Sequence, residues 1–270
     1  MPIFAPMQKS VFIWVFMMKR IVSLIIVYGL VLGLASCDES VEDYLTEKTL
    51  AVRYASSDEF AADEYILNLD NYTKITYNSA SDVVVAVENG KSDYGILNEF
   101  DYSKFILSDR AVIKKEVCSY TEDYCAYFES ENTELQEAFN DALADIREDG
   151  TLDAIEAAHF SGKEFSPVHT ETENGTLTML CDPNFENRVY TDEDGSVVGL
   201  DVDIAREICG AMGYGLDIVT GDFDRLFLML EKGEGDFIIT ASQFTEERAE
   251  YYLASDVYFT LNFFVIERER

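Results

Sequence analysis

The sequence predicts an α/β protein with two similar lobes, and two observations carry this prediction. Short apolar runs of β type alternate with amphipathic helical stretches in two separate series, which begin at Leu50 and Leu177. Residues 88–96 also return as residues 231–239, and each copy ends a helix at a glycine, turns around an aspartate and enters an apolar strand. Two α/β lobes in one chain usually face each other across a cleft that holds a small ligand.

The first series has the helix and strand boundaries that are typical of a mainly parallel sheet covered by helices. Ser79 and Asp82 are typical of a helix N-cap, and Gly90 is typical of a helix end. The polar stretch between Cys118 and Cys125 is typical of the end of a hairpin. The expected elements are, in order, a strand at 50–54, a helix at 57–67, a strand at 74–77, a helix at 79–88, a strand at 93–97 and a hairpin around 118–125.

The second half of the chain begins with helices. Leu135, Phe139, Ala142 and Ile146 share one face of a helix that Gly150 ends. The expected elements are helices at 132–146 and 152–160, a linker at 161–175, a strand at 177–181, a hairpin turn at 192–195, a helix at 201–212, a strand at 216–219, a helix at 224–232, a strand at 236–240, a short helix at 245–251 and a strand at 259–266.

Length and charge limit the classes of function. The 270 residues suffice for one or two domains, and 48% hydrophobic and 13% aromatic content indicate a globular protein. The 52 acidic and 20 basic residues give a net charge of −32. Such a surface repels phosphate backbones and anionic lipid headgroups, so we expect no nucleic-acid partner.

The N-terminal region predicts export. Lys19 and Arg20 precede an apolar run at 21–34, as in a secretory signal peptide, and Leu34-Ala35-Ser36-Cys37 resembles a bacterial lipobox. We therefore expect residues 1–37 to be a lipoprotein signal peptide, with Cys37 carrying the lipid and residues 38–48 forming a tether. The protein would then lie outside the cytoplasm, anchored to a membrane of the cell envelope; an uncleaved N-terminal anchor is the alternative.

The remaining cysteines and the histidines point to no metal, cofactor or catalytic site. Cys118 and Cys125 could form a disulfide across the expected hairpin or remain thiols, and the sequence leaves both open. Cys181 and Cys209 are interpreted as buried thiols, because no Cys or His spacing fits a metal site. With two histidines and no nucleophile or phosphate-binding motif, the sequence predicts no enzyme and no cofactor.

Motifs in the last third of the chain resemble those of a known family. They are Asp182-Pro183-Asn184-Phe185, residues 195–205, Phe223-Asp224-Arg225-Leu226, residues 233–239 and residues 244–249. In this order they resemble the N-terminal lobe of the family 3 solute-binding proteins, which serve polar amino-acid ABC transporters and have the type II periplasmic-binding fold. The resemblance implies a two-lobed clamshell.

Residues 50–160 resemble the remainder of the same fold, so the two parts stand in reversed order. In a circular permutant, residues 49–127 form lobe two, while residues 128–160 supply the closing helices of lobe one and residues 176–270 form lobe one itself. In a truncated tandem pair, each part belongs to a separate incomplete module. We favour the permutant, because a half-module would leave the apolar face of its sheet uncovered.

The resemblance assigns an anion site to lobe one. Arg248 stands where family members pair an arginine with the ligand α-carboxylate, since a guanidinium can donate two parallel hydrogen bonds. Thr240, Ala241 and Gln243 would complete the cradle. Members often have glycine and threonine where this chain has Ala241 and Gln243, and the added side chain at 241 restricts the approach of a carboxylate.

The facing lobe supplies donors and an acceptor in the same comparison. Ser56 and Ser57 would contribute hydroxyl and amide groups, with Ser57 the expected helix cap. Asn98 stands where many members have an aspartate that receives the ligand ammonium, so we expect weaker pairing there. The residues expected to line the side-chain pocket are Asp182, Phe185 and Phe223.

These residues predict a binding protein that captures a small carboxylate-bearing solute, an amino acid in the simplest case, and delivers it to the permease of an ABC transporter. Two alternatives to this function remain: a sensory module that signals to a separate partner, and a truncated or degenerate binding protein.

Overall fold

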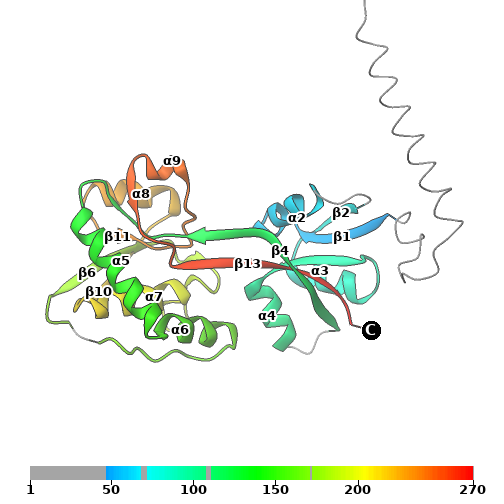
Figure 1. Cartoon of the computed structure of the whole chain (residues 1–270), viewed down its shortest axis with the longest axis horizontal. Helices are drawn as coiled ribbons and strands as arrows, with labels where there is room; N and C mark the ends of the chain where they lie inside the picture. Colours follow the sequence, from blue (N-terminus) through cyan, green and yellow to red (C-terminus); the bar gives the residue numbers. More distant parts are fainter. Residues whose placement is uncertain (1–46, 68–71, 108–110, 171, 270) are drawn as a thin grey trace, which may run out of the picture. The chain divides into compact units, whose positions relative to one another are not determined.

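The fold begins with a strand at Lys48 in a computed structural model, which describes residues 47–269 except 68–71, 108–110 and 171 (Figure 1). The expected signal peptide, Cys37 and nearly all of the expected tether lie outside the described residues. Within the described part of the chain, no helix combines the length and the apolar character that crossing a bilayer requires.

The first sheet, with its helices, is called lobe two here. Its strand order is β2-β1-β3-β13-β4; β1 pairs in parallel with β2 and β3, and β13 is antiparallel to β3 and β4. The elements are β1 (Lys48–Arg53), α2 (Ser57–Leu67), β2 (Tyr72–Tyr77), α3 (Ala80–Glu88), β3 (Tyr94–Asn98), α4 (Glu99–Leu107), β4 (Val112–Tyr124) and β13 (Phe259–Arg268).

The second sheet, with its helices, is called lobe one. Its strand order is β10-β6-β11-β5-β12, and a small sheet β7-β8-β9 holds the hairpin expected around 192–195. The elements are β5 (Tyr127–Glu129), α5 (Thr133–Glu148), α6 (Thr151–Phe160), β6 (Thr176–Cys181), β7 (Asn184–Phe185), β8 (Val189–Thr191), β9 (Val197–Val198), α7 (Leu200–Ala211), β10 (Gly215–Thr220), α8 (Phe223–Glu231), β11 (Phe237–Ile238), α9 (Glu246–Ala249) and β12 (Tyr252–Ala254).

Each sheet contains one strand from the other part of the sequence. β5 pairs with β11 and β12, while β13 pairs with β3 and β4, and β4 and β13 run side by side in Figure 1. The described chain passes between the sheets at two points, residues 125–126 and 255–258. The expected boundary of lobe one at residue 270 therefore differs from the structure, because strand 259–268 belongs to the sheet of lobe two.

The repeated segment forms the same αβ corner in both lobes. Gly90 ends α3 with φ +67° and Gly233 ends α8 with φ +68°, a left-handed conformation that costs a residue with a Cβ atom about 1–2 kcal/mol. The following aspartate accepts a hydrogen bond from the backbone of the neighbouring parallel strand. Asp93 Oδ2 accepts from the Thr49 N–H at 2.8 Å, and Asp236 Oδ2 accepts from the Thr178 N–H at 2.6 Å.

The hairpin expected around 118–125 is wrong. Residues 112–124 form one long strand, and β13 pairs along it with two register shifts. Cys118 and Cys125 are buried free thiols. Seven residues along an extended strand span roughly 23 Å, whereas the Cα atoms of a disulfide lie at most about 7 Å apart. Burial raises the pKa of both thiols to about 12.

Candidate functional site

A cleft of about 550 Å³ lies between the two lobes. Its residues come from α2 and β4 of lobe two and from β7, α8, α9 and the loop after β11 of lobe one. They are Ser57, Phe60, Tyr120, Glu122, Tyr124, Phe185, Phe223, Ala241, Gln243 and Arg248. An adjoining cavity of about 270 Å³ shares Ser57, Tyr124, Phe185 and Ala241 with this cleft.

The loop after β11 is attached to β4 by backbone hydrogen bonds. Tyr124 and Gln243 form an antiparallel bridge, the Cys125 N–H donates to the Ser242 carbonyl at 3.1 Å, and the Phe244 N–H donates to the Asp123 carbonyl at 3.0 Å. This loop carries the predicted anion cradle. Its position in the cleft is therefore fixed by β4 itself.

Arg248 lies on the lobe one side of the cleft. It belongs to α9, whose N-cap Thr245 accepts a hydrogen bond from the Arg248 N–H at 3.2 Å. Its guanidinium lies 5.3 Å from the ring centre of Phe223 and 5.6 Å from that of Phe227, and its Nη1 donates to the Gln243 carbonyl at 2.8 Å. Among the described residues no carboxylate forms an ion pair with Arg248, so its charge faces the cleft without a counter-ion from the protein.

Aromatic side chains form much of the cleft wall. Phe185 and Phe223 meet edge to face with ring centres 6.0 Å apart, and both line the cleft. Phe60 lines the lobe two side and is 65% exposed. The cleft can therefore cover an apolar part of a ligand as well as a charged one.

Two of the predicted cradle and pocket residues are occupied by internal contacts. Thr240 is fully buried, and its hydroxyl accepts from the Asp182 N–H at 2.8 Å. The Asp182 carboxylate in turn accepts from the Phe223 N–H and from Asn184 Nδ2. Neither residue lines the cleft. Both hold the loops that present Phe223 and Ala241.

Ala241 is at the cleft surface, but its amide is already used. The residue has φ +50°, and its N–H donates to Asp201 Oδ2 at 2.6 Å. Asp201 is fully buried and also pairs with Arg188 Nε at 2.6 Å and accepts from the Tyr258 hydroxyl. Burial lowers the pKa of Arg188, but the Asp201 charge outweighs it and raises that pKa above its ordinary value. The backbone cradle is therefore part of a buried ion-pair network.

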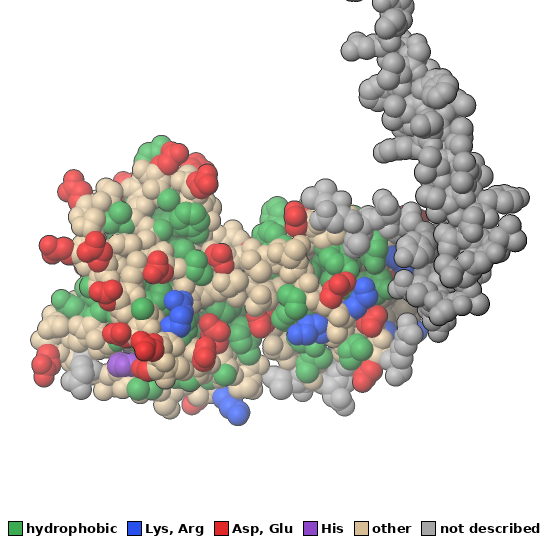
Figure 2. Space-filling view, viewed as in Figure 1, with side chains coloured by type: hydrophobic (Ala, Val, Ile, Leu, Met, Phe, Trp, Pro, Cys, Tyr) green, Lys and Arg blue, Asp and Glu red, His purple; other side chains and the backbone are tan. Residues whose placement is uncertain are grey.

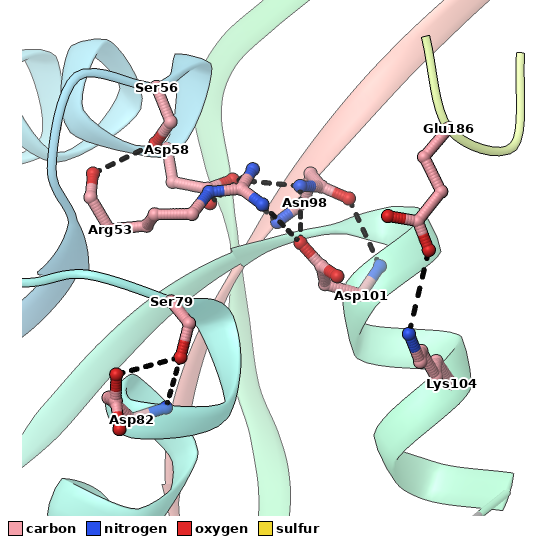
Figure 3. Close-up of polar contacts among 9 residues, drawn as sticks. All are labelled: Arg53, Ser56, Asp58, Ser79, Asp82, Asn98, Asp101, Lys104 and Glu186. Carbon is pink, nitrogen blue, oxygen red and sulfur yellow. Dashed lines mark hydrogen bonds and ion pairs between the residues drawn. The ribbon is translucent and has the colours of Figure 1, made fainter. Parts of the chain in front are cut away.

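The lobe two residue Asn98 is likewise engaged by internal contacts (Figure 3). Its Nδ2 donates to Asp58 Oδ1 and to Asp101 Oδ2, each at 3.0 Å, and its Oδ1 accepts from the Asp101 N–H. Arg53 pairs with both aspartates, at 3.0 and 3.2 Å. Burial raises the pKa of Asp58 to about 6, although the neighbouring Arg53 charge lowers it. Asn98 lines only the adjoining cavity, where its polar atoms hold neighbouring residues in place.

The two serines exchange the roles expected from the sequence. Helix α2 begins at Ser57, so Ser56 occupies the position before the first helical residue; its hydroxyl donates to the Arg53 carbonyl at 2.8 Å. Ser57 lines both the cleft and the adjoining cavity. Of the two serines, Ser57 is therefore the one that lines the cleft.

Phe60, Tyr120, Glu122 and Tyr124 line the cleft but were not among the predicted site residues. Tyr120, Glu122 and Tyr124 alternate along β4 and share one face of it. That alternation is visible in the sequence, but it was hidden by the interpretation of the segment as a hairpin end.

Charge elsewhere on the described surface is acidic. Asp and Glu side chains lie over both lobes on the face drawn in Figure 2, and Lys and Arg are fewer there. Among the described residues, no group of three or more His, Cys, Asp and Glu side chains is placed to hold a metal ion.

Comparisons with known proteins find a similar family for the last third of the chain. Residues 177–270 match the family described as bacterial extracellular solute-binding proteins, family 3. The probable ABC transporter arginine-binding protein ArtJ of Chlamydia trachomatis serovar D is 38% identical over 76 residues, which are 28% of this chain and 28% of that protein. The arginine-binding extracellular protein ArtP of Bacillus subtilis is 24% identical over 99 residues, 36% of this chain and 39% of that protein.

Among solved structures, the arginine-bound domain 1 of TmArgBP is 34% identical, with a TM-score of 0.31 and coverage of 35% of this chain and 80% of that one. The chain spans well under half the length of the two curated relatives. The similarity to the bacterial extracellular solute-binding proteins, family 3, thus lies in residues 177–270.

Proposed function

We propose that the protein is an extracytoplasmic, lipid-anchored solute-binding protein that captures a small carboxylate-bearing solute for an ABC transporter. The observation that carries this proposal is Arg248, a guanidinium that faces a 550 Å³ cleft and pairs with no carboxylate among the described residues. In a protein with a net charge of −32, an arginine with no acidic partner is placed to receive an anion from outside. The relatives named as arginine-binding proteins favour an amino acid as the solute.

The same proposal includes the permuted order of the lobes. A tandem pair of incomplete modules would keep the strands of each part in its own sheet. Instead, β5 completes the sheet of the later part and β13 completes the sheet of the earlier part, while α5 and α6 pack against α7. This exchange supports one binding unit built from both parts of the chain.

The site is tested by the thermal stability of the full chain in mild detergent, screened against the common amino acids and small carboxylates. A ligand at one hundred times its Kd stabilises by about 2.7 kcal/mol, which raises Tm by about 5–10 °C in a chain of this size. We expect Arg248→Ala to abolish this rise. Arg248→Lys should retain only part of it, because lysine lacks the paired donors.

The matched control is Arg225→Ala, which removes the same charge from an exposed position in α8 outside the cleft. It should keep the ligand-induced rise in Tm. An equal rise in Tm for wild type and Arg248→Ala would show that Arg248 does not bind the ligand. If no compound in the screen raises Tm, the proposed function is wrong.

A further inference from the structure

A buried carboxylate lies in the same cleft as Arg248. Glu122 is 5% exposed, and it lines the cleft from β4. The Tyr120 hydroxyl donates to its Oε1 at 3.1 Å, and the Tyr124 hydroxyl donates to its Oε2. Burial, followed by the Glu122 charge, raises the pKa of Tyr120 to about 12, so this hydroxyl stays a proton donor at neutral pH.

Glu122 lacks a cationic partner. Across the residues that the structure describes, no lysine, arginine or histidine forms an ion pair with it, whereas the buried Asp58 and Asp201 pair with Arg53 and Arg188. Removing a carboxylate from water is costly unless its charge is balanced. Two hydroxyl donors occupy two of about four acceptor positions on a carboxylate. The remaining capacity can accept hydrogen bonds from a bound group.

The two unbalanced charges of the cleft come from different lobes. Arg248 is a cation on the lobe one side, and Glu122 is an anion on a strand of the lobe two sheet. Asn98, which was predicted to receive the ammonium group, does not line this cleft, and its Nδ2 donates to Asp58 and Asp101. Glu122 is the carboxylate that lines the cleft among the described residues.

We propose that Glu122 accepts a cationic nitrogen of the ligand, an ammonium or a guanidinium, while Arg248 holds its carboxylate. The ligand class is then a small molecule that carries both charges. This inference rests on the proposed function and assigns to Glu122 the role that the family resemblance predicts for Asn98.

Isothermal titration with two matched pairs of probes tests the inference on the full chain in mild detergent. L-arginine and L-citrulline differ in the charge of the side chain, and L-norvaline and valerate differ in the α-ammonium group. A hydrogen bond to a charged group contributes about 1.5–3 kcal/mol, or about ten- to a hundredfold in affinity. We expect wild type to prefer the cationic member of at least one pair by this factor, and Glu122→Gln to lose most of the preference.

Asp123→Asn is the control, because it removes one negative charge from the adjacent residue on the opposite face of β4, where Asp123 accepts from the Thr260 hydroxyl. It should keep the preference within about twofold, since it changes the net charge but not the cleft. The unliganded Tm of each variant checks its fold. Glu122→Asp, which withdraws the charge by one methylene, serves if Glu122→Gln does not fold, and it should show a smaller preference than wild type.

The outcomes separate this inference from the proposed function. Wild type can bind the probes while Glu122→Gln, or its substitute Glu122→Asp, keeps the full preference. In that case Glu122 is not the acceptor, although the binding function stands. Equal affinity of wild type for both members of each pair also overturns the inference. If wild type binds none of the four probes, the assignment of a doubly charged ligand fails, and the broader thermal screen decides the function by itself.

Discussion

Ala241 shows how one residue limits the site predicted from the sequence. Its φ of +50° is unfavourable for a residue with a Cβ atom, and its N–H is held by the buried Asp201. A ligand carboxylate that approached this amide would have to displace a hydrogen bond from a buried ion-pair network. We therefore expect the anion to be held mainly by the Arg248 side chain.

Glu156 leads to a prediction about pH. Burial, followed by the nearby charges of Asp153 and Glu99, raises its pKa from 4.5 to about 7. Because the folded chain then binds this proton more tightly than the unfolded chain, its stability falls as pH rises from 4.5 through about 7. Glu156→Gln should be more stable than wild type by roughly 1–2 kcal/mol at pH 8, after allowance for partial exposure.

Urea unfolding at pH 8 and pH 5.5 measures this difference. The gain from Glu156→Gln should fall to less than half at pH 5.5, where the folded wild type is already mostly protonated at this position. Glu148→Gln, an exposed position on the neighbouring helix α5, should change stability little at either pH. A gain that did not depend on pH would show that Glu156 carries no such penalty.

At the scale of elements, the repeated αβ corner has the same physical role in both lobes. A left-handed glycine ends the helix, and an aspartate then accepts a hydrogen bond from the backbone of the parallel strand beside it. The pairs are Asp93 with Thr49 and Asp236 with Thr178. The aspartate therefore helps to set the register of a parallel pair, which no short turn connects.

We predict that Asp93→Ala and Asp236→Ala each lower the free energy of unfolding by about 1.5–3 kcal/mol, the range for a hydrogen bond to a charged group. Urea unfolding provides the measurement. Glu234→Ala removes an exposed acidic side chain from the same turn as Asp236 and should change stability by less than about 0.5 kcal/mol. Equal effects of Asp236→Ala and Glu234→Ala would mean that the shared aspartate has no structural role.

At the scale of the molecule, the described chain from residue 47 onward forms one unit in which each part of the sequence completes the sheet of the other. The segment 161–175 has no helix or strand among its described residues, but it is not detached. The buried Glu207 accepts hydrogen bonds from the Val168 and His169 N–H groups, at 2.7 and 2.9 Å. The expected linker is thus anchored to α7.

Cleavage of this linker tests the permuted arrangement. A specific protease site inserted between Lys163 and Glu164, which are exposed, divides the chain into its two parts. We expect the fragments to elute together in size-exclusion chromatography and to separate only in urea, because β5 and β13 are exchanged between the sheets. Fragments that separated in native buffer would contradict a single unit and favour two tandem modules.

Much of the local structure follows from the sequence alone. Helix 57–67, the two αβ corners and the hairpin at 192–195 follow from apolar periodicity, caps and glycines, which act within a few residues of one another. Helix α4 and the short strands β5 and β12 were not among the expected elements. The family motifs also placed Phe185, Phe223 and Arg248, and the structure brings these three side chains to one cleft.

Which strands share a sheet, and which polar groups remain open to a ligand, depend on contacts between distant parts of the chain. The partners of β5 and β13 lie more than a hundred residues away, so no local pattern distinguishes one long joining strand from a hairpin at 118–125. The hydrogen bonds of Asn98 with Asp58 and of the Ala241 amide with Asp201 join residues 40 positions apart. Among the described residues, the absence of a cation beside Glu122 is likewise set by the assembled fold. Pairing and burial are properties of the assembled fold, which is why the site could be located from the sequence but its charges could not.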